Sequence, residues 1–490
     1  MARGPTDLKG SRDGSWAKPK TAGVEAEACL DRDTAQTDCR GALSERKIPE
    51  SLFGSANPSY IIAPMLNRIS VASIAIILLV LSHIGISAAA QENVFHARFT
   101  GVLSQHGVVG GGIAVVHIDV QPMEFWFGEA RRDKLLPVDA ETSYNWASIT
   151  KTMTAIAILQ LRDRGQLALD DPAVLYVPEL RQVHDEYGSI DAITIRQLLC
   201  HSAGFRNPTW PWDCDESANC DWQPFEPTKW AQVAAMLPYT HIAFKPGSHW
   251  SYSNLGYVIL GQIIERISGD DFEVYLDKNI LKPLGMTESY FDRSPYFLES
   301  HVSASYLREG SKLVPQPFNF DTGITTSNSG LKAPITDMEK YLRFLIGDPA
   351  NSTYSFVLKR SSLEEAWTGV LPAVQAGAKP TPYTSGLHGS QPWMGLGFFV
   401  LQAAGRRYIY HDGDQGGFSS ELLVDPAGRA ASILVVNTTD TGTSAPAATL
   451  HPQSNTEPDP TTDLRLVLRN DLIENVFPSY AASKSASKNQ

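Results

Sequence analysis

The stretch YNWASITKTMTAI, residues 144–156, decides how the chain is organised. From Thr152 to Leu161 the sequence has no charged residue, glycine or proline, which predicts a buried helix. Ser148 and Lys151 stand three residues apart at the head of this run, and positions i and i+3 lie on one face of a helix. Burial makes a charged lysine costly and lowers its pKa. The stretch therefore predicts a serine hydroxyl that Lys151 activates as a nucleophile.

The pattern Ser-x-x-Lys is weak by itself, since it is expected about once by chance in a chain of this length. Another match, SASK at residues 485–488, is polar on all sides. The match at Ser148, unlike this one, has an apolar helical run behind it. We interpret residues 485–488 as a chance match and residues 481–490 as a disordered tail.

Composition places the chain among ordinary globular proteins. Its 490 residues are 43% hydrophobic and 19% charged, enough for a large core and, on length alone, for two to three domains. The net charge of −12 argues against nucleic acid as a partner.

No metal or other cofactor is expected. The five cysteines are too few for a disulfide scaffold and lack zinc spacing. Four histidines also lack metal-ligand spacing, and we assign them structural or surface roles: His184, His201, His241 and His249.

The N-terminal part of the chain predicts export. Residues 1–64 are polar and without periodicity, so we expect disorder. Residues 65–90 join a basic start to an uncharged apolar stretch, 69–90, that ends in small residues. This pattern is typical of a signal peptide cleaved near Ala90, with Met65 as the true start, or of an uncleaved membrane anchor. A buried core helix is the third reading.

Three cysteines have separate interpretations. Cys214 and Cys220 lie in a loop rich in tryptophan and proline, where export would permit a disulfide; two free thiols are the alternative. The tryptophans of this loop could wall a substrate cleft or cover the core. Cys200 follows an apolar run, which indicates buried packing.

The order of predicted elements is strands, then helices, then strands. A β-hairpin is predicted from 113–118 and 123–128, and helical patterns dominate from 194 to 311. A polar linker at 440–461 precedes a closing helix at 463–476. Later strands are predicted at 394–401, 407–410, 421–424 and 431–436.

Two further stretches carry chemistry. In FKPGSHWSYSN, residues 244–254, a Pro-Gly turn precedes Tyr252 and Asn254, whose spacing can aim both side chains at one cleft. A lysine ammonium nearby would favour the Tyr252 phenolate, which suits it to take a proton. In YHDGDQGGFSS, residues 410–420, the glycines allow close backbone approach and leave an N–H free to donate to an oxyanion.

Together, Ser148-x-x-Lys151, Tyr252-x-Asn254 and His411-x-Gly413 resemble the penicillin-recognising serine hydrolases. The likeness is strongest to the class C β-lactamase branch with its esterases and D-amino-acid-specific peptidases, and it spans about residues 95–440. Other parts of the sequence carry it too: LLCHSAGF at 198–205, YVILG at 257–261 and PLGMT at 283–287.

The resemblance implies an α/β (α+β) fold of the β-lactamase/transpeptidase type for residues 91–480. An antiparallel sheet flanked by helices would be built from early and late parts of the chain. A mostly helical lobe, about residues 190–325, would be inserted between them. The cleft would lie where the two lobes meet.

The resemblance also implies a role for each motif residue. Ser148 would be acylated, Lys151 and Tyr252 would transfer protons, and water would then release the acyl group. The remaining roles are substrate binding by Asn254, by His411 in place of the family's lysine, and by Gly413, with the N–H groups of Ser148 and Asp414 forming the oxyanion hole.

One departure from the family bears on the substrate. The Lys-Thr-Gly motif of β-lactamases holds a substrate carboxylate, whereas His411 is mostly neutral at pH 7 and Asp414 adds a negative charge beside the hole. We therefore predict hydrolysis of small esters or amides, with weak or absent β-lactam turnover. The alternatives are a D,D-carboxypeptidase or D-aminopeptidase of cell-wall peptides, and a non-catalytic penicillin-binding-type protein.

Overall fold

The computed structural model describes residues 91–205, 209–210, 227–348, 351–374, 391–440 and 463–480. The apolar stretch 69–90, the Cys214–Cys220 loop and both predicted disordered ends lie outside these ranges. Within them, no helix is long and apolar enough to cross a bilayer.

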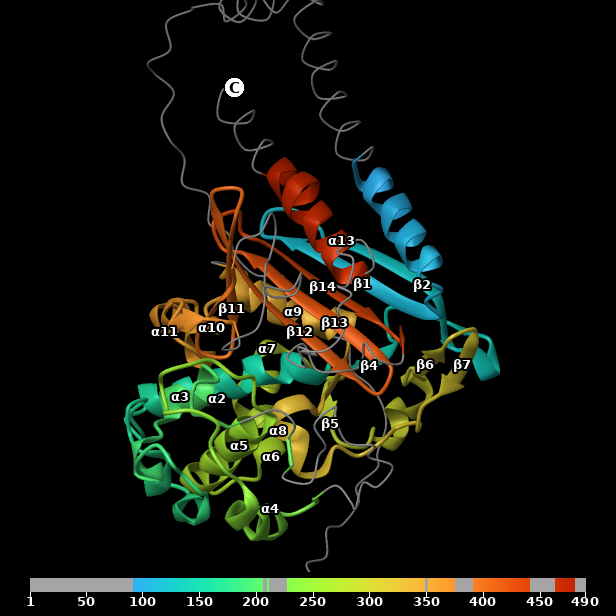
Figure 1. The fold of residues 1–490 in the computed structure, drawn as a ribbon. Helices are drawn as coiled ribbons and strands as arrows, with labels where there is room; N and C mark the ends of the chain where they lie inside the picture. The colour runs from blue at the N-terminus through green and yellow to red at the C-terminus, as the bar shows by residue number, and fades with distance from the viewer. Residues whose placement is uncertain are drawn as a thin grey trace, which may run out of the picture. The chain divides into compact units, whose positions relative to one another are not determined.

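The described residues form one large antiparallel sheet in the order β3-β2-β1-β14-β13-β12-β11-β10-β9 (Figure 1). Strand β1 pairs along its length with β14, so the early and late parts of the chain share one sheet, as predicted. The strands of this sheet are β1 (Gly110–His117), β2 (Met123–Arg131), β3 (Leu136–Pro137), β9 (Leu371–Pro372), β10 (Trp393–Met394), β11 (Phe399–Ala403), β12 (Arg406–Gln415), β13 (Phe418–Asp425) and β14 (Ala430–Val436).

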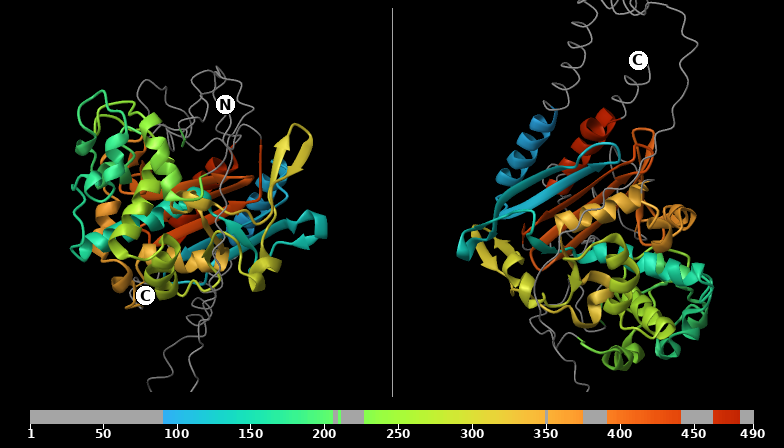
Figure 2. Two further views of the ribbon diagram at one scale, coloured as in Figure 1. Left: turned by 90° about the horizontal axis from the view of Figure 1, so that it is seen from below. Right: turned by 180° about the vertical axis from the view of Figure 1, so that it is seen from behind.

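Helices cover both faces of the sheet. Residues 91–105 and α13 (Leu464–Asp471) lie on one face, whereas α2 (Thr150–Asp163) and α9 (Ile335–Ile346) lie on the other (Figures 1 and 2). Alternate side chains of each strand feed the two cores. In β12, Ile409 packs on the α2 face and Tyr410 on the α13 face.

The helical lobe packs against α2, which is buried without a break from its start to Leu161, as predicted. The lobe's helices are α3 (Ile195–Leu199), α4 (Trp230–Met236), α5 (Asn254–Ser268), α6 (Phe272–Leu276), α7 (Lys282–Leu284) and α8 (Thr326–Ser329). Two short helices, α10 (Tyr354–Val357) and α11 (Arg360–Ala366), follow α9.

Two small sheets complete the described part of the chain. They have the orders β4-β8-β5 and β15-β6-β7, and the second projects from the body in Figure 1. Their strands are β4 (Ser143–Asn145), β5 (Tyr290–Phe291), β6 (Tyr306–Glu309), β7 (Lys312–Pro315), β8 (Leu331–Pro334) and β15 (Thr438–Asp440).

Most of the predicted elements are present. The predicted β-hairpin, the closing helix and the strands at 407–410, 421–424 and 431–436 are confirmed. The prediction of one strand at 394–401 is wrong, because the chain turns between Met394 and Phe399. Gly397 makes this turn with φ +79°, and a Cβ there would lie 2.4 Å from the Cβ of Ala155 on α2. Close packing of the turn on α2 therefore requires glycine.

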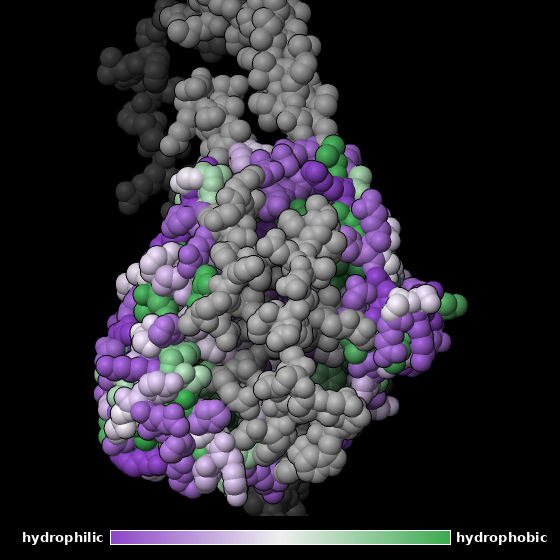
Figure 3. All heavy atoms as spheres, in the orientation of Figure 1, coloured by the Kyte–Doolittle hydropathy of each residue, from purple (hydrophilic) through white to green (hydrophobic). Residues whose placement is uncertain are grey.

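The hydropathy of the described surface agrees with the burial of apolar side chains in the two cores. On the face shown in Figure 3, hydrophilic side chains predominate among the coloured atoms and hydrophobic ones are scattered. Scattered apolar side chains are normal for a folded domain.

Candidate active site

Ser148 lies on a sharp turn between β4 and α2. The turn is the 3₁₀ segment Ala147–Ile149, and Ala147 has a positive φ of 48°. The Asn145 side chain holds this conformation, since its Oδ1 accepts from the Ala147 N–H at 2.7 Å. A positive φ in a non-glycine residue is strained and persists where surrounding contacts enforce it. The turn leaves Ser148 partly exposed between buried neighbours.

Lys151 contacts the serine, as the spacing predicted. Its Nζ lies 3.0 Å from Ser148 Oγ and donates to the Asn328 carbonyl at 2.9 Å. The lysine is fully buried, and desolvation holds its pKa well below the usual value. A neutral amine can donate one N–H to Asn328 and offer its lone pair to the Ser148 hydroxyl. Asn328, which the sequence analysis missed, thus orients the amine.

Tyr252 completes the contact with the nucleophile. Its side chain hydrogen-bonds to Ser148, and its ring centroid lies 4.8 Å from Lys151 Nζ. Burial raises the pKa of Tyr252, the Ser148 hydrogen bond opposes the rise, and the charges of Asp414 and Asp412 add to it. The expectation of a favoured phenolate is therefore wrong. Desolvation disfavours the charged phenolate, so Tyr252 is a protonated phenol at rest.

His201 holds the segment that carries Tyr252. It is buried with a positive φ of 56°, and its Nδ1 accepts from the Ser253 N–H at 3.1 Å. Its ring lies 4.4 Å from that of Tyr252, centroid to centroid. The structural role assigned to this histidine agrees with these contacts. Its place in LLCHSAGF was the one sequence signal for its proximity to the site.

Asn254 is the first residue of α5, whose N-terminus is capped by the Ser253 hydroxyl. Its Nδ2 donates to Thr209 Oγ1 at 3.1 Å. Its Oδ1 is buried and has no hydrogen-bond partner among the described residues. An unpaired buried acceptor is costly, so this oxygen is available to a substrate N–H.

His411 and Gly413 face the serine turn from β12, which is one continuous strand up to Gln415. A Cβ on Gly413 would lie 2.4 Å from the Trp146 carbonyl and 3.2 Å from the Ser148 nitrogen, so only glycine allows this approach. Burial and the nearby Lys151 lower the pKa of His411 to about 4, which keeps the ring neutral.

The tautomer of His411 follows from one contact. Its Nδ1 lies 2.7 Å from the Asp412 carbonyl, which can only accept, so Nδ1 carries the proton. Its Nε2 is therefore a lone-pair acceptor, and it is buried without a partner among the described residues. The side chain that replaces the family's lysine is thus an acceptor and not a cation.

The Asp414 carboxylate does not lie beside the serine turn. Alternation along β12 turns it to the opposite face, where its Oδ2 lies 2.8 Å from Arg465 Nη1 of α13. Burial raises the pKa of Asp414 and the Arg465 charge opposes that rise. The prediction of a negative charge beside the oxyanion hole is therefore wrong, because the Asp414 carboxylate is paired with Arg465 on the far side of the strand.

Among the described residues, one edge of β12 near the serine is free to bind a ligand, as the predicted oxyanion hole requires. Strand β11 pairs with β12 only as far as Tyr410, so the edge of residues 411–415 on that side has no strand partner in the described structure. An N–H on such an edge can donate to a ligand. The N–H groups of Ser148 and Asp414 remain the predicted donors.

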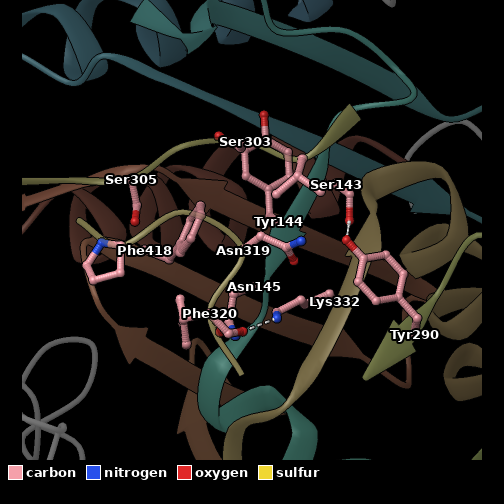
Figure 4. A pocket seen from close by; sticks show the side chains of 12 residues that line it. Ser143, Tyr144, Asn145, Tyr290, Ser303, Ser305, Asn319, Phe320, Lys332 and Phe418 are labelled. Carbon is pink, nitrogen blue, oxygen red and sulfur yellow. Dashed lines mark hydrogen bonds between the residues drawn. The ribbon is translucent and has the colours of Figure 1, made fainter. Parts of the chain in front are cut away.

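A separate cavity lies behind the serine turn, between β4, β8 and the segment around Phe320 (Figure 4). It contains Lys332, whose Nζ donates to the Phe320 carbonyl at 2.5 Å and to the Asp292 carbonyl. Desolvation lowers the pKa of Lys332 to about 8. Sequence reasoning did not single out this lysine. Its ammonium is hydrogen-bonded to the two backbone carbonyls.

Fold and site together define a two-lobed serine hydrolase fold with Ser, Lys and Tyr side chains meeting at the lobe boundary. A model of the Beta-lactamase family matches residues 95–453, and the chain belongs to that family. The predicted fold class is thereby confirmed.

The chain resembles several known sequences and solved structures. It is 25% identical over 335 residues to Protein flp of Staphylococcus aureus (strain COL), covering 68% of this chain and 61% of that protein. The octameric penicillin-binding protein homologue from Pyrococcus abyssi has a TM-score of 0.60 and 26% identity, covering 72% of this chain and 74% of its own. A class C β-lactamase has a TM-score of 0.57 at 19% identity over 75% of this chain and 98% of its own, which shows the fold.

Proposed function

We propose that the protein hydrolyses small esters or amides through an acyl-enzyme on Ser148. The observation that carries this proposal is the 3.0 Å contact between the Ser148 hydroxyl and a buried Lys151 whose pKa is lowered. As Ser148 Oγ attacks the substrate carbonyl carbon, its proton passes to the neutral Lys151 amine. The Tyr252 phenol then donates its proton to the leaving group and is reprotonated from Lys151. Water attacks the acyl-enzyme to release the acid.

The charges that face the serine support a neutral substrate. The pKa of His411 is lowered to about 4, so its ring is uncharged near pH 7, and burial disfavours the charged form of Lys151. The carboxylates of Asp412 and Asp414 are paired on the other face of β12. A substrate carboxylate would find no cation in place of the family's lysine. This argues against D,D-carboxypeptidase and β-lactamase activity and favours uncharged esters and amides.

Covalent labelling tests the proposal. The purified chain is treated with a fluorophosphonate probe, and mass spectrometry of its peptides locates the adduct. We expect an adduct on Ser148, turnover of p-nitrophenyl butyrate, and slow or absent nitrocefin hydrolysis. Ser148→Ala should abolish labelling and turnover, whereas the exposed Ser355→Ala control should leave both unchanged. Labelling at another residue, or activity that survives Ser148→Ala, contradicts the proposal.

We also propose that the hydrolase domain is exported. The support is the sequence of residues 65–90, which matches a signal peptide or an anchor. Mass spectrometry of the intact protein from the native host would show cleavage near Ala90 or retention of the stretch in the membrane fraction. An intact chain in the cytoplasmic fraction contradicts export.

A further inference from the structure

Two buried arginines project from α13 toward the strand that carries His411 and Gly413. Arg465 and Arg469 are four residues apart, so they lie on one face of the helix. Both are nearly inaccessible, with 5% and 3% of their surface exposed. Buried arginines are rare unless they are paired.

Their partners are spaced to match. Asp412 and Asp414 are two residues apart on β12 and so share the face toward α13. Arg465 Nη1 lies 2.8 Å from Asp414 Oδ2, and Arg469 Nη2 lies 2.8 Å from Asp412 Oδ1. The helix and the strand are thus joined by two parallel buried ion pairs.

Further contacts tie the same helix to the neighbouring strand. Arg469 also lies 2.6 Å from Glu421 Oε2 on β13, and Glu421 is the residue opposite Asp412 in the sheet. The Arg469 guanidinium stacks over the Tyr410 ring at 4.3 Å from its centroid. Arg465 is also held by Asp463, the residue that caps α13. Neither arginine can leave without exposing a buried carboxylate to an apolar core.

The ion pairs specify which face of β12 meets the serine. Residues alternate along a strand, so a slip of one position would turn the carboxylates of Asp412 and Asp414 toward Ser148 and His411 toward α13. Buried ion pairs add little stability compared with apolar packing, but they penalise every register that separates them. They therefore act on the placement of the strand more than on the stability of the fold.

We infer that Arg465 and Arg469 are positioning residues that hold β12 in the register at which Gly413 contacts the Ser148 turn. The inference rests on the proposed function, because it assigns the arginines to the same reaction. They touch neither Ser148 nor Lys151 and act through Asp414 and the strand backbone. A misplacement of about 1 Å at a catalytic group can lower a rate by about a hundredfold.

Arg465→Gln, made in the full chain, is the primary test, with p-nitrophenyl butyrate as substrate. We expect kcat to fall by about tenfold or more, while KM changes by less than about threefold, because the oxyanion donor on this strand acts mainly in the transition state. Arg465→Lys, which keeps the charge, should recover a large part of kcat.

The sheet offers a matched control. Arg406 and Asp425 form an ion pair of the same length, 2.8 Å, between β12 and β13 at the end of the hairpin away from Gly413, with Asp425 buried and Arg406 partly exposed. Arg406→Gln should lower the free energy of unfolding, because it leaves the buried Asp425 carboxylate without its partner, and should leave kcat unchanged. Equal loss of kcat in both variants, or unchanged kcat in Arg465→Gln, overturns the inference.

A second variant covers the case in which Arg465→Gln does not fold. The double variant Arg465→Gln with Asp414→Asn removes both charges and keeps two groups that can hydrogen-bond, and its kcat should again be lowered. Wild-type kcat in this folded double variant overturns the inference. Fluorophosphonate labelling distinguishes failure of the proposed function from failure of this inference. Absence of a Ser148 adduct in the wild type refutes the proposed function. A normal adduct with unaltered kcat in the variants refutes only the positioning role of the α13 arginines.

Discussion

Lys151 and Lys332 are two buried lysines close to the same turn, and they differ in what surrounds the amine. Both have lowered pKa values because of desolvation. The carboxylates of Asp292 and Asp321 oppose this effect at Lys332, and its ammonium donates to two backbone carbonyls. Among the described residues, the Lys151 amine has the Ser148 hydroxyl and the Asn328 carbonyl within hydrogen-bond distance.

The comparison shows that burial alone does not make a catalytic lysine. A base needs both a neutral amine and a proton donor within hydrogen-bond distance. The surroundings of Lys332 favour a charged ammonium, because two carbonyls accept from it and carboxylates lie nearby. The surroundings of Lys151 favour a neutral amine, because it has one carbonyl acceptor and one hydroxyl that can donate to it. The four predictions below test this difference, from the largest expected effect to the smallest.

Replacing each lysine by methionine should separate the two roles most strongly. Lys151→Met should lower kcat for p-nitrophenyl butyrate by about a thousandfold, since it removes the proton acceptor while keeping the volume of the side chain. Lys332→Met should change kcat by less than about threefold. Comparable losses in the two variants would mean that the distinction between the lysines is wrong.

Removal of the Tyr252 hydroxyl should have the next largest effect on kcat. Tyr252→Phe should lower kcat by about a hundredfold, because it removes the proton donor for the leaving group but leaves the ring against His201. Tyr341→Phe is a matched control, since that buried hydroxyl hydrogen-bonds to Thr152 at 2.8 Å and takes no part in the proposed chemistry. Full activity in Tyr252→Phe would remove Tyr252 from the mechanism.

The pKa of Lys332 predicts a stability change at alkaline pH. Its folded-state pKa of about 8 lies below the unfolded value of 10.5, so between these values the unfolded chain binds the proton that the folded chain has released. Stability should therefore rise with pH in this window, by about 2 kcal/mol between pH 8 and 9.5. Urea unfolding of the wild type and of Lys332→Met measures it, and the variant should lack this increment.

The lowered pKa of His411 predicts a smaller change in the free energy of unfolding at acid pH. Its folded-state pKa of about 4 is below the unfolded value of 6.5, so its contribution is complete above pH 6.5 and is lost as the pH falls toward 4. The loss should be about 1 kcal/mol between pH 6.5 and 5.5. His411→Gln should show a flatter profile in urea unfolding, and an unchanged slope would argue that the imidazole is not buried and neutral.

Much of the site could be predicted from the sequence because its central contact is local. Ser148 and Lys151 are one helical turn apart, and their contact depends only on a helix forming where the apolar run predicts one. The strands around His411 and Gly413 were also predictable from their alternation and turn glycines. The break between Met394 and Phe399 was not, because it depends on the close approach of α2 to Gly397.

By itself, the sequence determined the helix behind Ser148, the order of strands and helices, and the three motifs of the family. The tertiary structure alone decided which groups are charged, because a pKa depends on desolvation and on neighbours far away in the chain. It made Tyr252 a protonated phenol and made His411 an acceptor. It also turned Asp414 toward Arg465, a pairing across about fifty residues that only the packing of α13 on the sheet creates.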